Sequence, residues 1–149
     1  MFSGILNAFK APKPEPLPEP DAKLALGALL VRVALSDHRY RVEEIGRIDR
    51  LLARINGLNP IDAAKMRATC EKLEKQAPDT QDFAHLIRET VSFEARIDAL
   101  EAMWEVVLAD GIRRDEEVAV ITTAQEALGL SQTDSDAARS RAETEMKPG

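Results

Sequence analysis

The placement of proline constrains this chain more than any other feature of its sequence. Five of the eight prolines stand at alternate positions between residues 12 and 20, whereas only Pro60 and Pro78 interrupt the chain from residue 21 to residue 147. Proline breaks a helix interior, so the proline-poor part can form long helices. The alternating prolines favour an extended polyproline II spacer of about 28 Å, at ~3.1 Å per residue.

The composition of the proline-poor part favours helices over sheets. Only 6 of the 149 residues are aromatic, yet 44% are hydrophobic, so the core must consist mainly of Ala, Leu, Ile and Val. Apolar residues recur at helical spacing, and a chain of this length forms one domain of ordinary size. We therefore expect an all-α, single-domain bundle of about seven helices and no β-strand. The expected helices cover residues 22–36, 42–55, 60–77, 80–91, 92–109 and 115–128, and a last one begins at 131.

The first twenty residues are expected to lie apart from this bundle. Residues 1–10 place Phe2, Ile5, Leu6 and Phe9 on one helical face, which predicts a short amphipathic segment. A helix of that length is marginal alone and needs a surface to lie against. The surface could be its own domain, a dimer mate, the groove of a protein partner or a membrane. Residues 11–20 are the Pro-rich linker, and residues 21–149 are the helical domain.

Charge and cysteine content exclude several classes of function. The net charge of −6 argues against a nucleic-acid partner, and residues 79–117 alone carry 11 acidic and 4 basic residues. A single cysteine can form neither an internal disulfide nor a cysteine metal cage. The longest apolar run, residues 22–35, is shorter than the ~20 residues that cross a bilayer. We expect a cytoplasmic protein, with membrane association left open through residues 1–10.

An internal repeat emerges when the sequence is shifted on itself by 73 residues. Residues 30–52 then align with residues 103–125, and each unit reads as helix, loop and helix. A glycine, a leucine and a helix-capping residue follow each unit, at 57–59 and 129–131. The expected bundle is therefore built from two pseudo-repeated helix–loop–helix units. The identical pairs are Val33 and Val106, Leu35 and Leu108, Asp37 and Asp110, Arg41 and Arg114, Glu43 and Glu116, and Glu44 and Glu117.

At these residues the sequence resembles the TerB-like (tellurite-resistance TerB) family. Its signature is an apolar helix that ends in Ala-Asp-Gly, followed by a glutamate seven residues after the aspartate, and it occurs twice. The second copy is intact at residues 109–111 with Glu117, whereas the first has Ser36, Asp37 and His38 with Glu44. The resemblance covers about residues 21–139. It implies a helical fold and a bacterial stress-response or tellurite-resistance setting, and the domain also occurs as a module in membrane-anchored co-chaperones.

Two carboxylates at each loop are the candidate metal ligands. Asp37, Glu44, Asp110 and Glu117 supply oxygen donors, which suit a hard divalent cation if the two loops meet. The resemblance supports this, because acidic residues at these positions are suspected ligands in the family. A purely structural role is the alternative, since acidic residues favour the first turn of a helix. The nearby arginines could oppose a cation, pair with the carboxylates or recruit an anion.

The remaining polar residues provide no recognisable catalytic arrangement. His38 replaces the glycine of the second copy, Gly111, where we expect a positive φ that histidine tolerates. Cys70 lies on an apolar helix stripe and reads as core material. We expect a non-enzymatic binding protein with no certain cofactor, a divalent metal ion being the possible one, and an unidentified protein partner. The alternative is a tethered interaction module without metal, held near a partner or membrane by residues 1–10.

Overall fold

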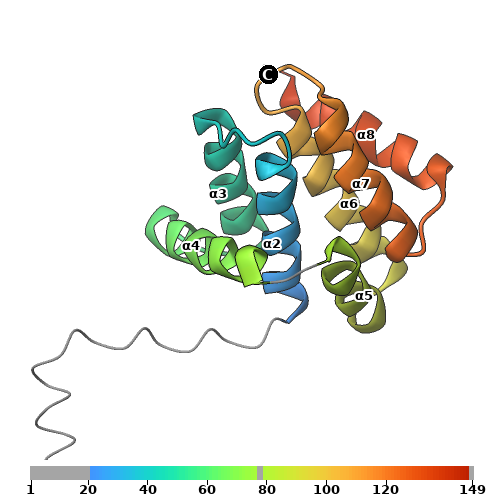
Figure 1. Ribbon diagram of the computed structural model, residues 1–149, viewed down its shortest axis with the longest axis horizontal. Coiled ribbons are helices and arrows are strands. Elements are labelled where there is room, and N and C mark those ends of the chain that lie inside the picture. Colours follow the sequence, from blue (N-terminus) through green and yellow to red (C-terminus); the bar gives the residue numbers. More distant parts are fainter. Residues whose placement is uncertain (1–20, 77–78, 148–149) are drawn as a thin grey trace, which may run out of the picture.

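The computed structural model describes residues 21–76 and 79–147, which form seven helices and no strand. The predicted amphipathic segment 1–10 and the linker 11–20 lie outside the described residues. Figure 1 shows α2 in the middle of the bundle, with α3 and α4 on one side and α6, α7 and α8 on the other. The all-α class is confirmed. The helices are α2 (Ala22–Leu35), α3 (Val42–Asn56), α4 (Pro60–Gln76), α5 (Thr80–Thr90), α6 (Phe93–Val107), α7 (Asp115–Ala127) and α8 (Gln132–Met146).

Helix α2 forms the centre of the core, as its nearly uninterrupted apolar sequence predicts. It contacts every helix from α3 to α7, and most of its residues from Ala25 to Ala34 are buried. The helix approaches α4 closely at Gly27, where an added Cβ would collide with the Cys70 sulfur. Both residues are therefore small because the two helices need the space.

The helix ends follow local signals in the sequence. The Asp21 carboxylate accepts a hydrogen bond from the Leu24 amide at 2.9 Å and so caps α2. Ser131 caps α8 in the same way, by accepting from the Asp134 amide at 3.0 Å. Gly57 follows α3 with a φ of 63°, a left-handed conformation that suits glycine. These contacts hold the loops between helices in defined positions.

Two expectations about burial are wrong. Val42 and Ile55 stand at helical spacing with Ile45, Ile48 and Leu52, which predicts one buried stripe along α3. Their side chains are instead 80% and 44% exposed, because α3 buries its middle and leaves its ends open. The spacing of Glu105 with Asp98 and Glu101 predicts a solvated face of α6 opposite its apolar stripe, but Glu105 is fully buried. Helix α3 lies across that face and supplies cationic partners to Glu105.

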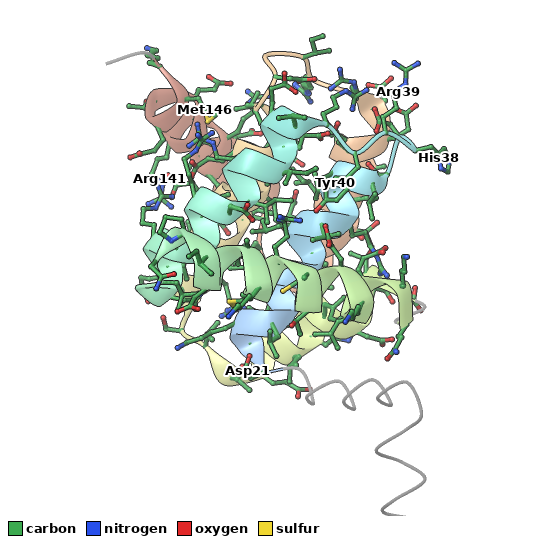
Figure 2. The ribbon with its side chains drawn as sticks, turned by 90° about the vertical axis from the view of Figure 1, so that its left-hand side faces the viewer. Asp21, His38, Arg39, Tyr40, Arg141 and Met146 are labelled. Carbon is green, nitrogen blue, oxygen red and sulfur yellow. The ribbon has the colours of Figure 1, made fainter. Side chains whose placement is uncertain are left out.

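The end of the chain is also more regular than its sequence predicts. The thin apolar stripe of the last helix predicts that its far end frays, yet α8 continues to Met146 (Figure 2). It packs along α6, where the Trp104 indole donates a hydrogen bond to the Ser135 hydroxyl at 3.2 Å. Ala138 and Ala142 are fully buried in the same contact. None of the described helices is long and apolar enough to cross a membrane.

Candidate functional site

The α2–α3 loop and the α6–α7 loop form the same turn. His38 has a φ of 66° and Gly111 a φ of 79°, which confirms the expected positive φ at both positions. The carboxylate of Asp37 accepts a hydrogen bond from the Arg39 amide at 3.2 Å, and that of Asp110 accepts one from the Ile112 amide at 3.1 Å. The two loops thus agree in detail. The duplication of the whole units stays a prediction.

Two arginines join the aspartates of both loops. Arg41 lies 2.8 Å from a carboxylate oxygen of Asp37 and 3.5 Å from one of Asp110. Arg114 lies 2.8 Å from Asp110 and 3.3 Å from Asp37. Each guanidinium therefore bridges its own loop and the other one. Of the three roles that the sequence left open for the arginines, pairing with the carboxylates is the one observed.

The two glutamates lie beneath this bridge. The side chains of Glu44 and Glu117 are 1% and 0% exposed. Arg41 lies 3.5 Å from Glu44 and 3.9 Å from Glu117, and Arg114 lies 3.6 Å from Glu117. The structure therefore brings all four predicted carboxylates together around two guanidinium groups. We call these six residues the loop cluster: Asp37, Arg41, Glu44, Asp110, Arg114 and Glu117.

The loop cluster leaves buried oxygen atoms without hydrogen-bond donors. Among the described residues, neither Glu117 oxygen has a hydrogen-bond partner, and Glu44 Oε2 has none. Burial, together with the neighbouring charge of Glu44, raises the pKa of Glu117 to about 8. Burial also raises the pKa of Glu44. At neutral pH Glu117 therefore keeps a proton.

The aspartates behave in the opposite way. The hydrogen bond from Arg114 holds the pKa of Asp110 below its ordinary value. Burial raises the pKa of Asp37, but the hydrogen bond and the charges of Arg41 and Arg114 outweigh it, so that this pKa also lies below its usual range. At neutral pH both aspartates therefore carry their negative charge and pair with the two guanidinium groups.

The donor chemistry of the loop cluster suits a hard cation only in part. All four candidate ligands are carboxylates, and three of their buried oxygens have no donor. The aspartate oxygens, however, are already held by guanidinium groups. Among residues 21–76 and 79–147, no three His, Cys, Asp or Glu side chains are arranged to hold a metal ion. A cation would therefore have to displace a guanidinium group from the aspartates.

The sequence did not indicate a second buried ion-pair group, between α3 and α6. Glu105 lies 3.5 Å from Arg47 and 3.0 Å from Arg54. The spacing of these arginines, seven residues apart and hence on one face of α3, was the available signal. The sequence alone does not show which helix lies across them.

Comparison with known proteins identifies the family of the chain. No curated protein and no solved structure matches it. The family model described as tellurite resistance protein TerB matches residues 23–140, a range that contains both loops and all six residues of the loop cluster. The match covers most of the chain and confirms the resemblance seen in the two loop motifs. The chain belongs to the TerB family, and is a helical protein of the tellurite-resistance type.

Proposed function

We propose that this TerB-type chain acts by binding, without turnover, and that the loop cluster is its binding site for a hard divalent cation. The observation that carries the proposal is the meeting of four carboxylates from two distant loops, with both oxygens of the buried Glu117 lacking a hydrogen-bond donor. A buried carboxyl group without donors is costly once it loses its proton, and a cation that binds it would stabilise that charged form. Oxygen-only donors select cations such as Mg²⁺, Ca²⁺ or Mn²⁺.

The residues of the loop cluster would contribute in two steps. Glu117 and Glu44 offer the oxygens that lack donors, but Glu117 must first lose its proton. Asp37 and Asp110 become available only when Arg41 and Arg114 turn away from them. The guanidinium groups of both arginines stand at the ends of long side chains at a partly exposed surface, so they can rotate toward water. Cation binding is therefore expected to release a proton and to strengthen as the pH rises.

Calorimetric titration of the full chain tests this proposal. Mg²⁺, Ca²⁺, Mn²⁺ and Zn²⁺ are added separately at pH 7, in two buffers that differ in ionisation enthalpy, so that released protons are counted. We expect saturable binding of one of the hard cations with release of about one proton. Glu117→Gln and Asp110→Asn should each weaken binding by on the order of 10-fold or more.

The control variant is Asp82→Asn, which removes an exposed carboxylate in the first turn of α5. It should bind as the unmodified chain does. Absence of saturable binding with all four cations, or binding unchanged by Glu117→Gln and Asp110→Asn, would show that the loop cluster is structural only. Circular dichroism of each variant establishes that a lost signal does not come from unfolding.

A further inference from the structure

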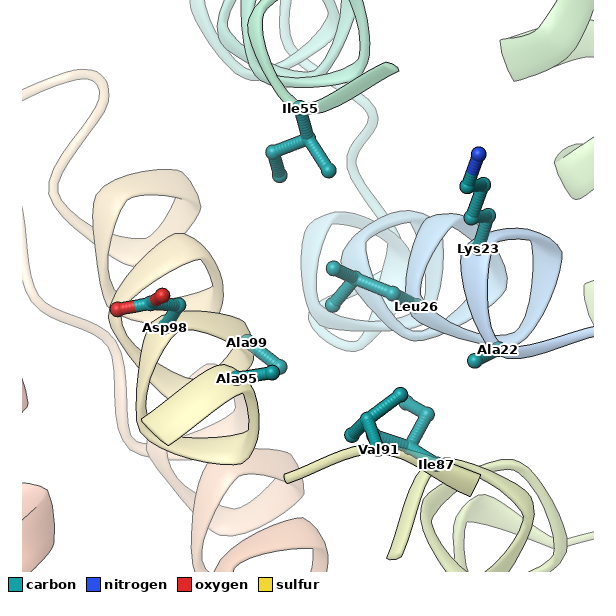
Figure 3. A pocket seen from close by; sticks show the side chains of 9 residues that line it. All are labelled: Ala22, Lys23, Leu26, Ile55, Ile87, Val91, Ala95, Asp98 and Ala99. Atoms are coloured by element: carbon teal, nitrogen blue, oxygen red, sulfur yellow. The ribbon is translucent and has the colours of Figure 1, made fainter. Parts of the chain in front are cut away.

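An apolar groove lies away from the loop cluster, where the helical domain begins. It has a volume of about 340 Å³, within the range of ligand pockets. Figure 3 shows Leu26 of α2, Val91 and Ala95 facing a common space, with Ile55 of α3 at its edge. Ile55 is 44% exposed, so apolar surface extends from the groove to the outside. An apolar groove with an apolar rim suits the stripe of an amphipathic helix.

The groove begins at the end of the Pro-rich linker. Ala22 and Lys23, the first two residues of α2, line it. Residues 1–20 therefore join the domain beside a groove of the kind that their apolar stripe requires. The stripe consists of Phe2, Ile5, Leu6 and Phe9.

The charges beside the groove match those of residues 1–10. Asp98 stands at its edge, and the adjoining depression holds Glu101 and Glu145 together with Arg54. Residues 1–10 contain Lys10 and no acidic residue. The positive charge of Lys10 can thus pair with these carboxylates while the predicted apolar stripe faces the groove.

We propose that residues 1–10 of a second copy of this chain dock in the groove, and that two chains exchange these segments reciprocally. The expected length of the linker favours the groove of a second copy over the chain's own groove. The alternating prolines favour an extended spacer of about 28 Å, which is longer than the ~15 Å of a ten-residue helix. Such a spacer would carry residues 1–10 beyond a groove that starts at Ala22 of the same chain. Reciprocal exchange closes a two-fold dimer with two identical docking contacts.

Sedimentation velocity of the full chain over a range of concentrations tests the exchange. We expect a reversible dimer whose dissociation constant rises by at least about 10-fold in Leu6→Asp, which interrupts the stripe, and in Ile55→Arg, which places a charge on the groove rim. Asn7→Asp and Ile61→Arg are matched controls. The first adds the same charge off the stripe, and the second changes an exposed isoleucine on α4 in the same way. Both should dimerise normally.

A mixing experiment then separates exchange from any other interface. The Leu6→Asp chain keeps an intact groove, and the Ile55→Arg chain keeps an intact segment 1–10. An equimolar mixture should therefore form a heterodimer through one intact docking contact, more tightly than either variant associates with itself. A full chain that is monomeric at all concentrations, a dimer indifferent to both variants, or a mixture without a heterodimer overturns the proposal.

Discussion

The α2–α3 loop and the α6–α7 loop share one turn but provide for their buried glutamates differently. Glu44 accepts a hydrogen bond from the Arg41 amide at 3.1 Å, whereas Glu117 has no hydrogen-bond donor among the described residues. Both side chains are almost completely buried. The backbone hydrogen bond from Arg41 opposes the effect of burial on the pKa of Glu44, whereas burial and the charge of Glu44 raise the pKa of Glu117 to about 8. Matching positions in two loops of the same conformation can thus differ in the hydrogen bonds that act on their pKa.

The substitution Glu117→Gln tests this difference with the largest expected effect on stability. The fold raises the pKa of Glu117 from an ordinary 4.5 to about 8, so between these pH values the folded chain binds more protons than the unfolded one. The contribution of Glu117 to stability therefore falls as the pH rises from about 4.5 to about 8. Gln mimics the protonated form, so the variant should be more stable than the unmodified chain by about 2–4 kcal/mol at pH 9 and by little at pH 5.

Urea unfolding at pH 5 and pH 9, with a chelator present, measures this effect. Glu116→Gln changes the exposed neighbouring glutamate and should alter stability by no more than about 0.5 kcal/mol. A Glu117→Gln chain that is less stable at pH 9, or equally shifted at both pH values, would contradict a protonated Glu117.

A second test is the effect of Glu44 on its counterpart. The charge of Glu44 contributes to the raised pKa of Glu117, after burial itself. Glu44→Gln removes that charge but keeps a carbonyl oxygen that can accept from the Arg41 amide. We expect the pKa of Glu117 to fall by about 1 unit. Carboxyl ¹³C NMR titration measures it directly, and an unchanged pKa would show that the two carboxyl groups do not interact.

The third and smallest test compares the turns. Gly111 has a positive φ and no atom within 4 Å of an added Cβ, so Gly111→Ala should destabilise the fold through backbone strain alone, by about 1–2 kcal/mol. His38→Gly relieves the same strain but adds freedom to the unfolded chain, and these effects of about 1 kcal/mol each nearly cancel. Thermal unfolding of both variants measures the difference. Equal losses of stability in both variants would contradict a shared positive-φ conformation of the two turns.

The sequence predicts the helices well because their signals are local. Pro60, Gly57 and Ser131 mark helix ends through their own backbone preferences, and the structure agrees with them. The matching motifs of the two loops also singled out four carboxylates that can share one site if the loops approach each other. All four carboxylates indeed meet.

The rest depends on distant contacts. Whether Glu105 faces water or Arg47 is decided by the path of α3 across α6, which no periodicity within α6 reveals. Val42 and Ile55 fit the helical stripe of α3 yet stay exposed, because no described helix covers its ends. For the same reason, the sequence does not show how the arginines bridge the two loops. Side-chain pairing follows from how loops 73 residues apart approach each other.

The close approach of α2 and α4 gives the protein an internal reporter of its own opening. Cys70 is fully buried against Gly27, and burial raises the pKa of its thiol to about 12. A thiol reagent needs an accessible thiolate, so it should modify this chain only when α4 separates from α2. Since the chain contains a single cysteine, the labelling rate reports the exposure of this one thiol. Under fast reclosing, that rate measures the free energy of opening the core without any engineered probe.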